Sequence, residues 1–269
     1  METEPTLVLG ATGSVGRRVA ARLDALGAHV RPATRNSATR FDWDDQRTWK
    51  PALNGVSRLF LMSPDGVPVA PGFVQMAVEL GVERMVLLSS RAIETIGDER
   101  LLDAERLVRT SGADWTVVRS DWFDQNFDEG HFRTAVRDGR LTVPLGDCRQ
   151  AFADLDDVAD VIALALREDG HTGRTYEVTG PHALSFGEAC EVISARTGRP
   201  LEFRGEPEDY RAFMTSLGRP EEEVEGEIAA FDALRALGDG KPLDTVPRLL
   251  GRSARSFEEY VASVPADRW

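Results

Sequence analysis

Lysine is nearly absent from this sequence: its 269 residues include only Lys50 and Lys241, and arginine carries almost all of the positive charge. Acidic residues outnumber basic ones by 45 to 32, and the formal net charge at pH 7 is −13. Because nucleic-acid binding needs a basic face, this balance argues against a nucleic-acid partner. The preference for arginine over lysine is interpreted as coding bias rather than as a functional feature.

Cysteines and long apolar runs are scarce as well. Cys148 and Cys190 lie far apart and show no metal-ligand spacing, so we expect buried thiols and no metal site. No apolar run is long enough to span a bilayer, and the N-terminus leads into a predicted strand without a signal peptide. We therefore expect a cytoplasmic protein with no membrane partner.

The sequence contains the pattern of an α/β protein. Hydrophobic residues make up 42% and charged residues 29% of the chain, an ordinary balance for a globular protein. Short apolar runs alternate with helical patterns, which predicts a doubly wound parallel sheet with right-handed crossovers. Strands are predicted at 6–9, 28–33, 58–62, 84–88, 114–118, 174–178 and 200–203. Helices are predicted at 15–26, 68–80, 98–110, 154–166, 206–238 and 253–261. A further helix is predicted to begin at Ser185, which forms a capping box with Glu188.

A glycine-rich stretch, GATGSVG at residues 10–16, lies between the first predicted strand and the first helix. Gly10 permits a sharp exit from the strand, Gly13 lets a diphosphate approach the backbone, and Gly16 lets the helix pack closely on the sheet. The amides at the helix start attract phosphates. An ordinary strand-to-helix turn is the alternative, but the placement favours dinucleotide binding. The predicted cofactor contacts are Gly10, Thr12, Gly13, Ser14, Val15 and Gly16.

The residue after the second strand predicts which dinucleotide binds. No acidic residue stands there to accept a ribose 2′-hydroxyl; Arg35 stands there instead and is suited to a 2′-phosphate, so NADP(H) is favoured. A solvated surface arginine is the alternative, and Arg40 is a weaker second candidate. Asp42 and Trp43 are predicted near the adenine, although Trp43 is equally compatible with simple packing.

Polar residues follow the next two strands, at the sheet edge where doubly wound folds bind ligands. Met62 is the last residue of the third predicted strand and Ser63 follows it, and both are predicted cofactor contacts. Ser89 and Ser90 come directly after the fourth predicted strand. Ser89 is a predicted cofactor contact, and Ser90 is a predicted catalytic hydroxyl that bonds a substrate carbonyl. A turn or helix cap is an equal alternative for both serines.

An aromatic segment follows the strand at 114–118 and suits a flat, apolar substrate. His131 is a candidate proton donor that Asp121 could orient; a packing histidine and a turn residue are the alternatives. Core packing is the preferred interpretation of Phe123 and Phe127. The candidate substrate contacts are Trp122, Phe123, Asn126 and His131.

Several of these segments resemble one family. The loop at 10–16 is similar to the GATGxxG loop of atypical short-chain dehydrogenases/reductases, the NmrA-like and quinone-oxidoreductase-like branch, and Arg35 matches the arginine of that branch. The segments 105–112 and 115–119 resemble its "E-x-x-L-x-x-S-G … T-x-x-R-P-x-x-F-x-x-N" pattern, with Ser120 in place of the proline. The segment 152–159 resembles its "D-x-x-D-V-A" helix start.

The resemblance implies a Rossmann-type fold and an NADPH-dependent reduction of a quinone or a polycyclic ketone or enone. The tyrosine–lysine pair of familiar reductases is absent, because the tyrosines stand at 176, 210 and 260 and no lysine lies between Lys50 and Lys241. A quinone needs no such pair, since water can protonate the hydroquinone anion. An NADP(H)-sensing regulator without turnover and a non-redox enzyme on the same fold are the alternatives.

The same pattern of strands and helices predicts the domain organisation. Residues 1–150 are predicted to form the NAD(P)-binding core, to which a helix and strand at 151–180 return. Residues 181–269 are predicted to form a small, mostly helical region that covers the substrate as a lid. The expected partner is a small aromatic or quinone-like molecule, and the sequence leaves open whether the chain forms a homodimer.

Overall fold

The computed structural model describes residues 4–269, which form two compact units. The sheet unit contains the chain up to Arg91 together with Asp98–Ser120 and Leu155–Val178. The second unit contains Ala92–Gly97, Asp121–Asp154 and Thr179–Trp269. The contacts therefore group residues 121–154 with the C-terminal part of the chain, whereas the sequence suggested a boundary near residue 150.

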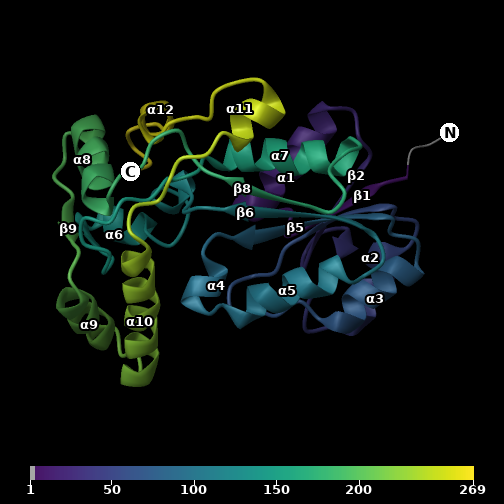
Figure 1. The fold of residues 1–269 in the computed structure, drawn as a ribbon, viewed down its shortest axis with the longest axis horizontal. Coiled ribbons are helices and arrows are strands. Elements are labelled where there is room, and N and C mark those ends of the chain that lie inside the picture. The colour runs from purple at the N-terminus through teal and green to yellow at the C-terminus, as the bar shows by residue number, and fades with distance from the viewer. Residues whose placement is uncertain (1–3) are drawn as a thin grey trace. The chain divides into compact units, whose positions relative to one another are not determined.

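The sheet unit is built on a seven-stranded parallel sheet with the strand order β3-β2-β1-β4-β5-β6-β8 (Figure 1). The order reverses direction at β1, the arrangement of a doubly wound Rossmann-type fold, so the predicted fold class is confirmed. The strands are β1 Thr6–Leu9, β2 Val30–Thr34, β3 Thr39–Arg40, β4 Arg58–Leu61, β5 Arg84–Ser90, β6 Asp114–Ser120 and β8 Arg174–Val178.

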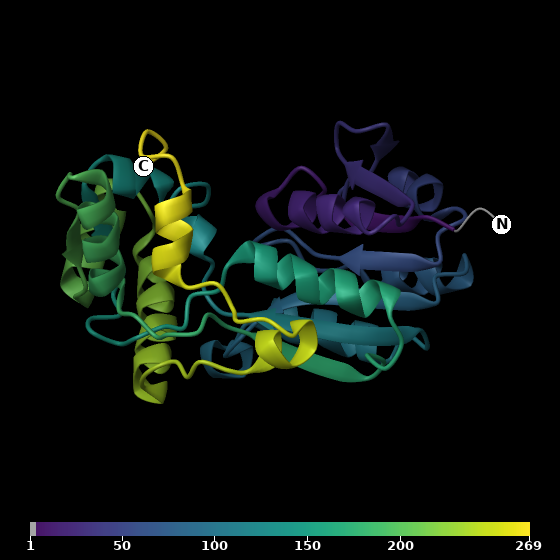
Figure 2. The same cartoon turned by 90° about the horizontal axis from the view of Figure 1, so that it is seen from above.

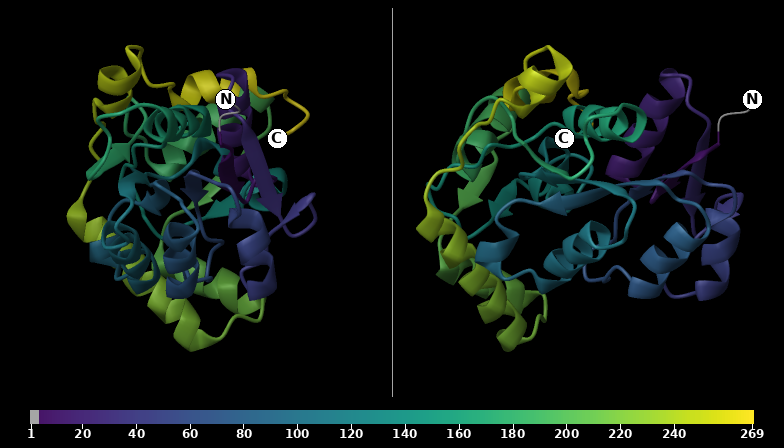
Figure 3. Two further views of the ribbon diagram at one scale, coloured as in Figure 1. Left: turned by 90° about the vertical axis from the view of Figure 1, so that its right-hand side faces the viewer. Right: turned by 45° about the vertical axis from the view of Figure 1, so that its right-hand side comes forward.

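Helices cover both faces of this sheet. Helices α1 (Ser14–Ala25) and α7 (Leu155–Arg167) lie side by side on one face, as Figures 1 and 2 show, and Arg18 pairs with Asp156 across them at 3.1 Å. Helices α2, α3 and α5 cover the opposite face, and Figure 3 shows the sheet between the two layers. Their bounds are α2 Trp49–Leu53, which follows the short 3-10 turn Gln46–Thr48, α3 Pro71–Glu79 and α5 Glu99–Arg109.

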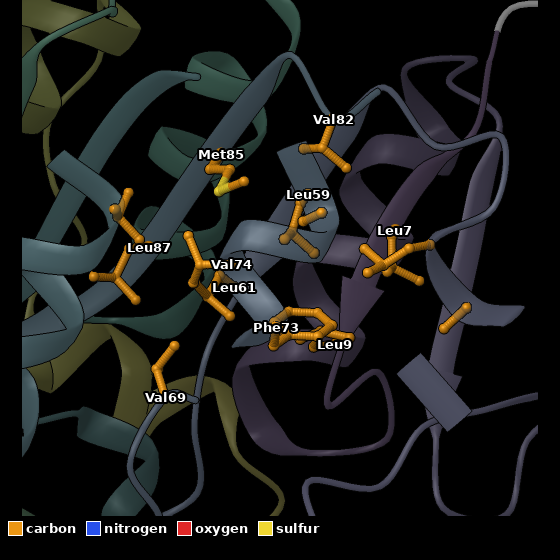
Figure 4. Packing of buried hydrophobic residues seen from close by; sticks show 14 of the residues in the cluster. Leu7, Leu9, Leu59, Leu61, Val69, Phe73, Val74, Val82, Met85 and Leu87 are labelled. Atoms are coloured by element: carbon orange, nitrogen blue, oxygen red, sulfur yellow. The ribbon is translucent and has the colours of Figure 1, made fainter. Parts of the chain in front are cut away.

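The core of the sheet unit follows from strand alternation. Every second residue of the central strands points toward α2, α3 and α5, where these side chains surround Phe73 and Val74 of α3 (Figure 4). Each buried leucine contributes roughly 1.5–3 kcal/mol to folding relative to an exposed one. The strand residues that form this layer include Leu7, Leu9, Leu59, Leu61, Met85 and Leu87.

The second unit is mainly helical and has a core of its own. Its two-stranded parallel sheet pairs β7 (Arg140–Thr142) with β9 (Glu202–Arg204). Phe127, Phe152 and Phe186 are fully buried and pack edge-on or tilted against one another. The helices are α4 Ile93–Ile96, α6 Arg133–Arg137, α8 Phe186–Thr197, α9 Pro207–Ser216, α10 Glu221–Leu237, α11 Thr245–Leu250 and α12 Phe257–Ser263, and a 3-10 turn spans Asp124–Asn126.

Some predicted elements differ from the structure. The single helix expected at 206–238 is wrong, because Gly218 adopts φ +76° and Pro220 starts a new helix, which separates α9 from α10. The last helix begins after Ser256 rather than at residue 253, since Ser256 and Glu259 form a capping box there. The predicted capping box of Ser185 and Glu188 is confirmed.

No helix within residues 4–269 is long and apolar enough to cross a membrane.

Candidate functional site

The glycine-rich loop is shaped by steric contacts that exclude side chains. Gly10 adopts φ +63°, and a Cβ on it would lie 2.7 Å from the Sδ atom of Met62. A Cβ on Gly16 would lie 2.6 Å from the carbonyl carbon of Gly10. The amide of Gly13 donates a hydrogen bond of 2.8 Å to the carbonyl oxygen of Gly10, which closes the turn. Glycine is therefore required at the two positions that the sequence assigned to the turn and to close packing.

The N-terminus of α1 follows the glycine-rich loop directly and, like several other helix starts of the chain, has no side-chain cap among residues 4–269. Gly13 precedes the helix, and within the described residues no side chain caps it and no acidic residue stands in its first turn. By contrast, Asp98 caps α5, and Ser185 and Ser256 cap α8 and α12. An uncapped helix start offers its amides to an anion, and Thr12 and Gly13 are exposed beside it. This arrangement fits the diphosphate of a dinucleotide.

Arg35 follows β2 in a turn that its neighbours stabilise. The amide of Thr34 donates to Ser37 Oγ at 2.8 Å, and Ser37 Oγ donates to the carbonyl oxygen of Thr39 at 2.7 Å. Arg35 is exposed, and no carboxylate of residues 4–269 pairs with it. Arg40, the second candidate, lies 3.7 Å from the carboxylate of Asp45. The structure thus leaves the Arg35 guanidinium available for a phosphate.

Asp42 and Trp43 lie in a small aromatic cluster at the edge of the sheet unit. The Asp42 carbonyl accepts a hydrogen bond of 3.0 Å from the indole of Trp49. The ring of Trp43 packs edge-on against Phe41 and Phe73, with centroids 5.0 and 5.1 Å apart. Packing therefore accounts for much of the Trp43 side chain, and contact of either residue with adenine stays a prediction.

Met62 and Ser63 follow β4 directly. The thioether of Met62 packs against Gly10, so this side chain forms one wall of the glycine-rich loop. Ser63 Oγ donates a hydrogen bond to the carbonyl oxygen of Val67 and so stabilises the loop after β4. Met62 is consequently the better placed of the two for a cofactor bound at the loop.

Ser89 and Ser90 lie within β5 and point to opposite faces of the sheet. Ser89 is buried and donates to Glu105 of α5 at 2.7 Å. Glu105, which is 3% exposed, also accepts two hydrogen bonds from Arg119, of 2.8 and 2.9 Å, and one from Arg109 at 2.8 Å. The Ser89 hydroxyl is thus used in a buried network. Ser90 faces away from this network, is half-buried, and stays the predicted catalytic serine.

The hydrogen-bond network around Glu105 was not predicted from the sequence. Glu105 and Arg119 each belong to a segment that resembles the family pattern, but they stand 14 residues apart. The sequence contained one clue to this network. Glu105 stands at a helix position that faces the sheet, and a carboxylate buried there needs cationic partners.

The aromatic segment after β6 lies in the second unit. Trp122 is half-buried, stacks on Phe132 with centroids 5.8 Å apart, and meets Phe186 edge-on at 5.5 Å. Phe127 is fully buried in the core of this unit, as preferred from the sequence. Phe123 is half-buried and bridges to Ala153 through its backbone.

The polar candidates of this segment occupy different environments. His131 is exposed and its ring meets Phe132 edge-on at 5.0 Å. The carboxylate of Asp121 accepts a hydrogen bond of 2.8 Å from the backbone amide of Trp122. Asn126 is 8% exposed and stands at the end of a 3-10 turn. Their roles with a substrate stay predictions.

Residues 4–269 contain no group of three or more potential metal ligands.

The parallel sheet, the order of its strands and the loop between β1 and α1 together define a Rossmann-type dinucleotide-fold protein. The chain belongs to the NmrA-like family, whose model matches residues 2–261.

The comparisons with individual proteins agree with this family. The chain is 31% identical to the uncharacterized oxidoreductase YesF of Bacillus subtilis, over 98% of this chain and 96% of that protein. It is 31% identical to the NAD(P)H azoreductase of Xenophilus azovorans, over 94% of this chain and 96% of the relative. Among solved structures, it resembles the NADPH-dependent quinone oxidoreductase QOR2 of Escherichia coli complexed with NADPH, with a TM-score of 0.78 and 21% identity over 96% of this chain and 98% of that chain.

Proposed function

We propose that this protein is an NADPH-dependent oxidoreductase that reduces a quinone or a related flat, conjugated carbonyl compound. Arg35 carries the cofactor assignment, because it follows β2, where a dinucleotide fold contacts the ribose, and has no carboxylate partner within residues 4–269. The uncapped start of α1 and the glycine turn support the diphosphate contact. The names of the azoreductase and of the quinone oxidoreductase support the class of reaction.

The reaction class makes few demands on acid–base residues. When bound, NADPH supplies a hydride to the acceptor. A quinone that accepts the hydride becomes a hydroquinone anion, which water protonates. The chain contributes binding and orientation, with the loop and Arg35 as the proposed phosphate contacts. Trp122, which is half-buried and stacks on Phe132 and Phe231, is the proposed aromatic contact for a flat substrate.

The tyrosines of the chain support a mechanism without a tyrosine acid. Tyr176 OH lies 2.9 Å from His171 Nδ1, Tyr210 OH donates to Glu227 at 2.8 Å, and Tyr260 OH donates to Asp128. Burial, together with the neighbouring carboxylate, raises the pKa of Tyr210 and of Tyr260 well above the usual value. All three hydroxyls are thus engaged inside the protein.

The same observation favours a second candidate function. A chain without a tyrosine acid could bind NADP(H) and pass its redox state to a protein partner without turnover. The two functions differ in a single measurable property, since only the reductase consumes NADPH when an acceptor is present.

The test mixes purified protein with NADPH and a panel of quinones, azo compounds and polycyclic ketones and follows the loss of NADPH absorbance. We expect turnover with at least one acceptor, a clear loss of kcat/KM in Trp122→Ala, and recovery in Trp122→Phe, which keeps an aromatic face. His131→Ala tests the predicted proton donor. Tight NADPH binding with no turnover on any acceptor would contradict the reductase and support the sensor.

A further inference from the structure

Ser90 and Ser120 are register partners at the carboxyl ends of β5 and β6. Arg84 of β5 donates to a carbonyl at the end of α7, and Thr116 of β6 donates to the carbonyl of His171, just after α7. Because side chains alternate along a strand, Ser90 and Ser120 point to this same α7 side of the sheet. Two hydroxyl-bearing side chains therefore stand next to each other at the ligand-binding edge.

The two hydroxyls are poorly satisfied within the protein. Ser120 is 2% exposed, and its Oγ has no hydrogen-bond partner among residues 4–269. Ser90 is half-buried, and its Oγ lies 3.3 Å from the carbonyl oxygen of Arg91, at the long end of the hydrogen-bond range. A buried hydroxyl without a partner costs stability, so its retention calls for an explanation.

The backbones that carry these serines are held on both sides. The amide of Arg91 donates to the carbonyl oxygen of Ser120 at 3.1 Å, which continues the strand pairing beyond Ser90. On the opposite face, Glu105 binds Ser89 and Arg119, the residues immediately before the two serines. Neighbouring strands lie about 4.8 Å apart, so rotation about χ1 brings the two Oγ atoms within hydrogen-bond reach.

We propose that Ser120 is a positioning residue that acts through Ser90. Its hydroxyl donates to Ser90 Oγ, which directs the Ser90 proton toward the carbonyl oxygen of a bound quinone. This assignment rests on the proposed function. As the hydride adds, the quinone gains two electrons, the nicotinamide is oxidised, and negative charge develops on the quinone oxygen. The Ser90 hydrogen bond stabilises that charge. No proton passes along the serine pair, since water protonates the product.

The test uses the full chain with NADPH and 1,4-naphthoquinone as the probe. Ser90→Ala should lower kcat by on the order of 100-fold, as for loss of a donor to a developing oxyanion. Ser120→Ala should lower kcat about three- to tenfold, the value of one hydrogen bond, with KM and the NADPH Kd unchanged. Ser120→Thr keeps the hydroxyl and should restore most of kcat. The double variant should be no slower than Ser90→Ala, because Ser120 acts only through Ser90.

Thr116 provides the matched control on the same strand and the same face. Its hydroxyl is satisfied by the His171 carbonyl at 2.8 Å, away from the carboxyl edge. Thr116→Val should lower the melting temperature and leave kcat unchanged, whereas Ser120→Ala should lower kcat and leave the melting temperature unchanged or raised.

Two outcomes would overturn the assignment without touching the proposed function. They are a Ser120→Ala variant with the wild-type kcat, and additive losses in the double variant. If the wild type consumes no NADPH with any acceptor, the proposed function fails, and the role of Ser120 fails with it.

Discussion

At the ends of β5 and β6, the polar residues on the two faces of the sheet differ in how far the protein satisfies their hydrogen bonds. On the α5 face, Ser89 and Arg119 are fully engaged by Glu105. On the α7 face, their neighbours Ser90 and Ser120 have few or no partners within the described residues. The same two strands therefore support folding on one face and leave hydrogen-bonding capacity on the other. At this edge of the sheet, polar side chains that have protein partners stabilise the fold, whereas those without partners among the described residues are the candidates for ligand contact.

The largest effect should come from breaking the satisfied face. Glu105→Ala leaves Arg119, which is only 12% exposed in its side chain, without its carboxylate. We expect the free energy of unfolding to fall by about 3–5 kcal/mol, because the largely buried Arg119 guanidinium loses the carboxylate that accepts two of its hydrogen bonds. Urea denaturation monitored by circular dichroism measures this.

An exposed ion pair on the same helix is the control for Glu105. Asp103 pairs with Arg106 at the surface of α5, with more than half of each side chain exposed. Asp103→Asn should cost less than about 0.5 kcal/mol. Equal losses in the two variants would show that burial does not set the value of these pairs.

The next largest effect concerns Arg35, which no carboxylate of the described part of the chain pairs with. Arg35→Ala should weaken NADPH binding about 10- to 100-fold, the value of hydrogen bonds to a charged group, and change NADH binding little. Titration calorimetry with both cofactors measures the difference. Arg40→Ala is the control, because Arg40 lies near Asp45 and should affect the two cofactors equally. Equal loss of NADPH and NADH affinity in Arg35→Ala would remove Arg35 from the phosphate site.

A smaller effect compares a capped helix start with an uncapped one. Ser185 accepts a hydrogen bond from the Glu188 amide at 3.1 Å, so Ser185→Ala should lower the stability by about 1 kcal/mol. Ser14 begins α1 without capping it, so Ser14→Ala should change the stability by less than about 0.5 kcal/mol. Thermal unfolding of both variants gives the comparison, and a larger loss in Ser14→Ala would contradict it.

The sequence predicted those features of the fold that depend on local pattern. The apolar runs placed six of the seven strands of the parallel sheet, and β8 has the predicted bounds at 174–178. The two-residue strand β3 was not predicted. The roles of Gly10 and Gly16 could be predicted from the sequence, because the need for glycine at these positions is steric and confined to one turn. The assignment of residues 121–154 to the second unit could not be predicted from the sequence. It depends on contacts of Phe127 and Phe152 with α8 and α12, which are distant in sequence.

The ends of the strands were missed for a physical reason. Strands β5 and β6 continue to Ser90 and Ser120, two residues beyond the apolar runs that predicted them. Polar residues at these positions are stabilised in the strand by Glu105 on α5, which is distant in sequence, so local propensity did not reveal them. The Ser90–Ser120 pair likewise appears only once the register between the strands is known.

We propose that the first loop binds a diphosphate through its backbone while Arg35 recognises the additional phosphate of NADP(H). Isothermal titration calorimetry of the wild-type chain with NADPH and with NADH measures both contributions. We expect saturable binding of NADPH with an affinity at least about tenfold higher than that of NADH. Absence of binding heat with both cofactors, confirmed by an independent equilibrium binding assay, would contradict it.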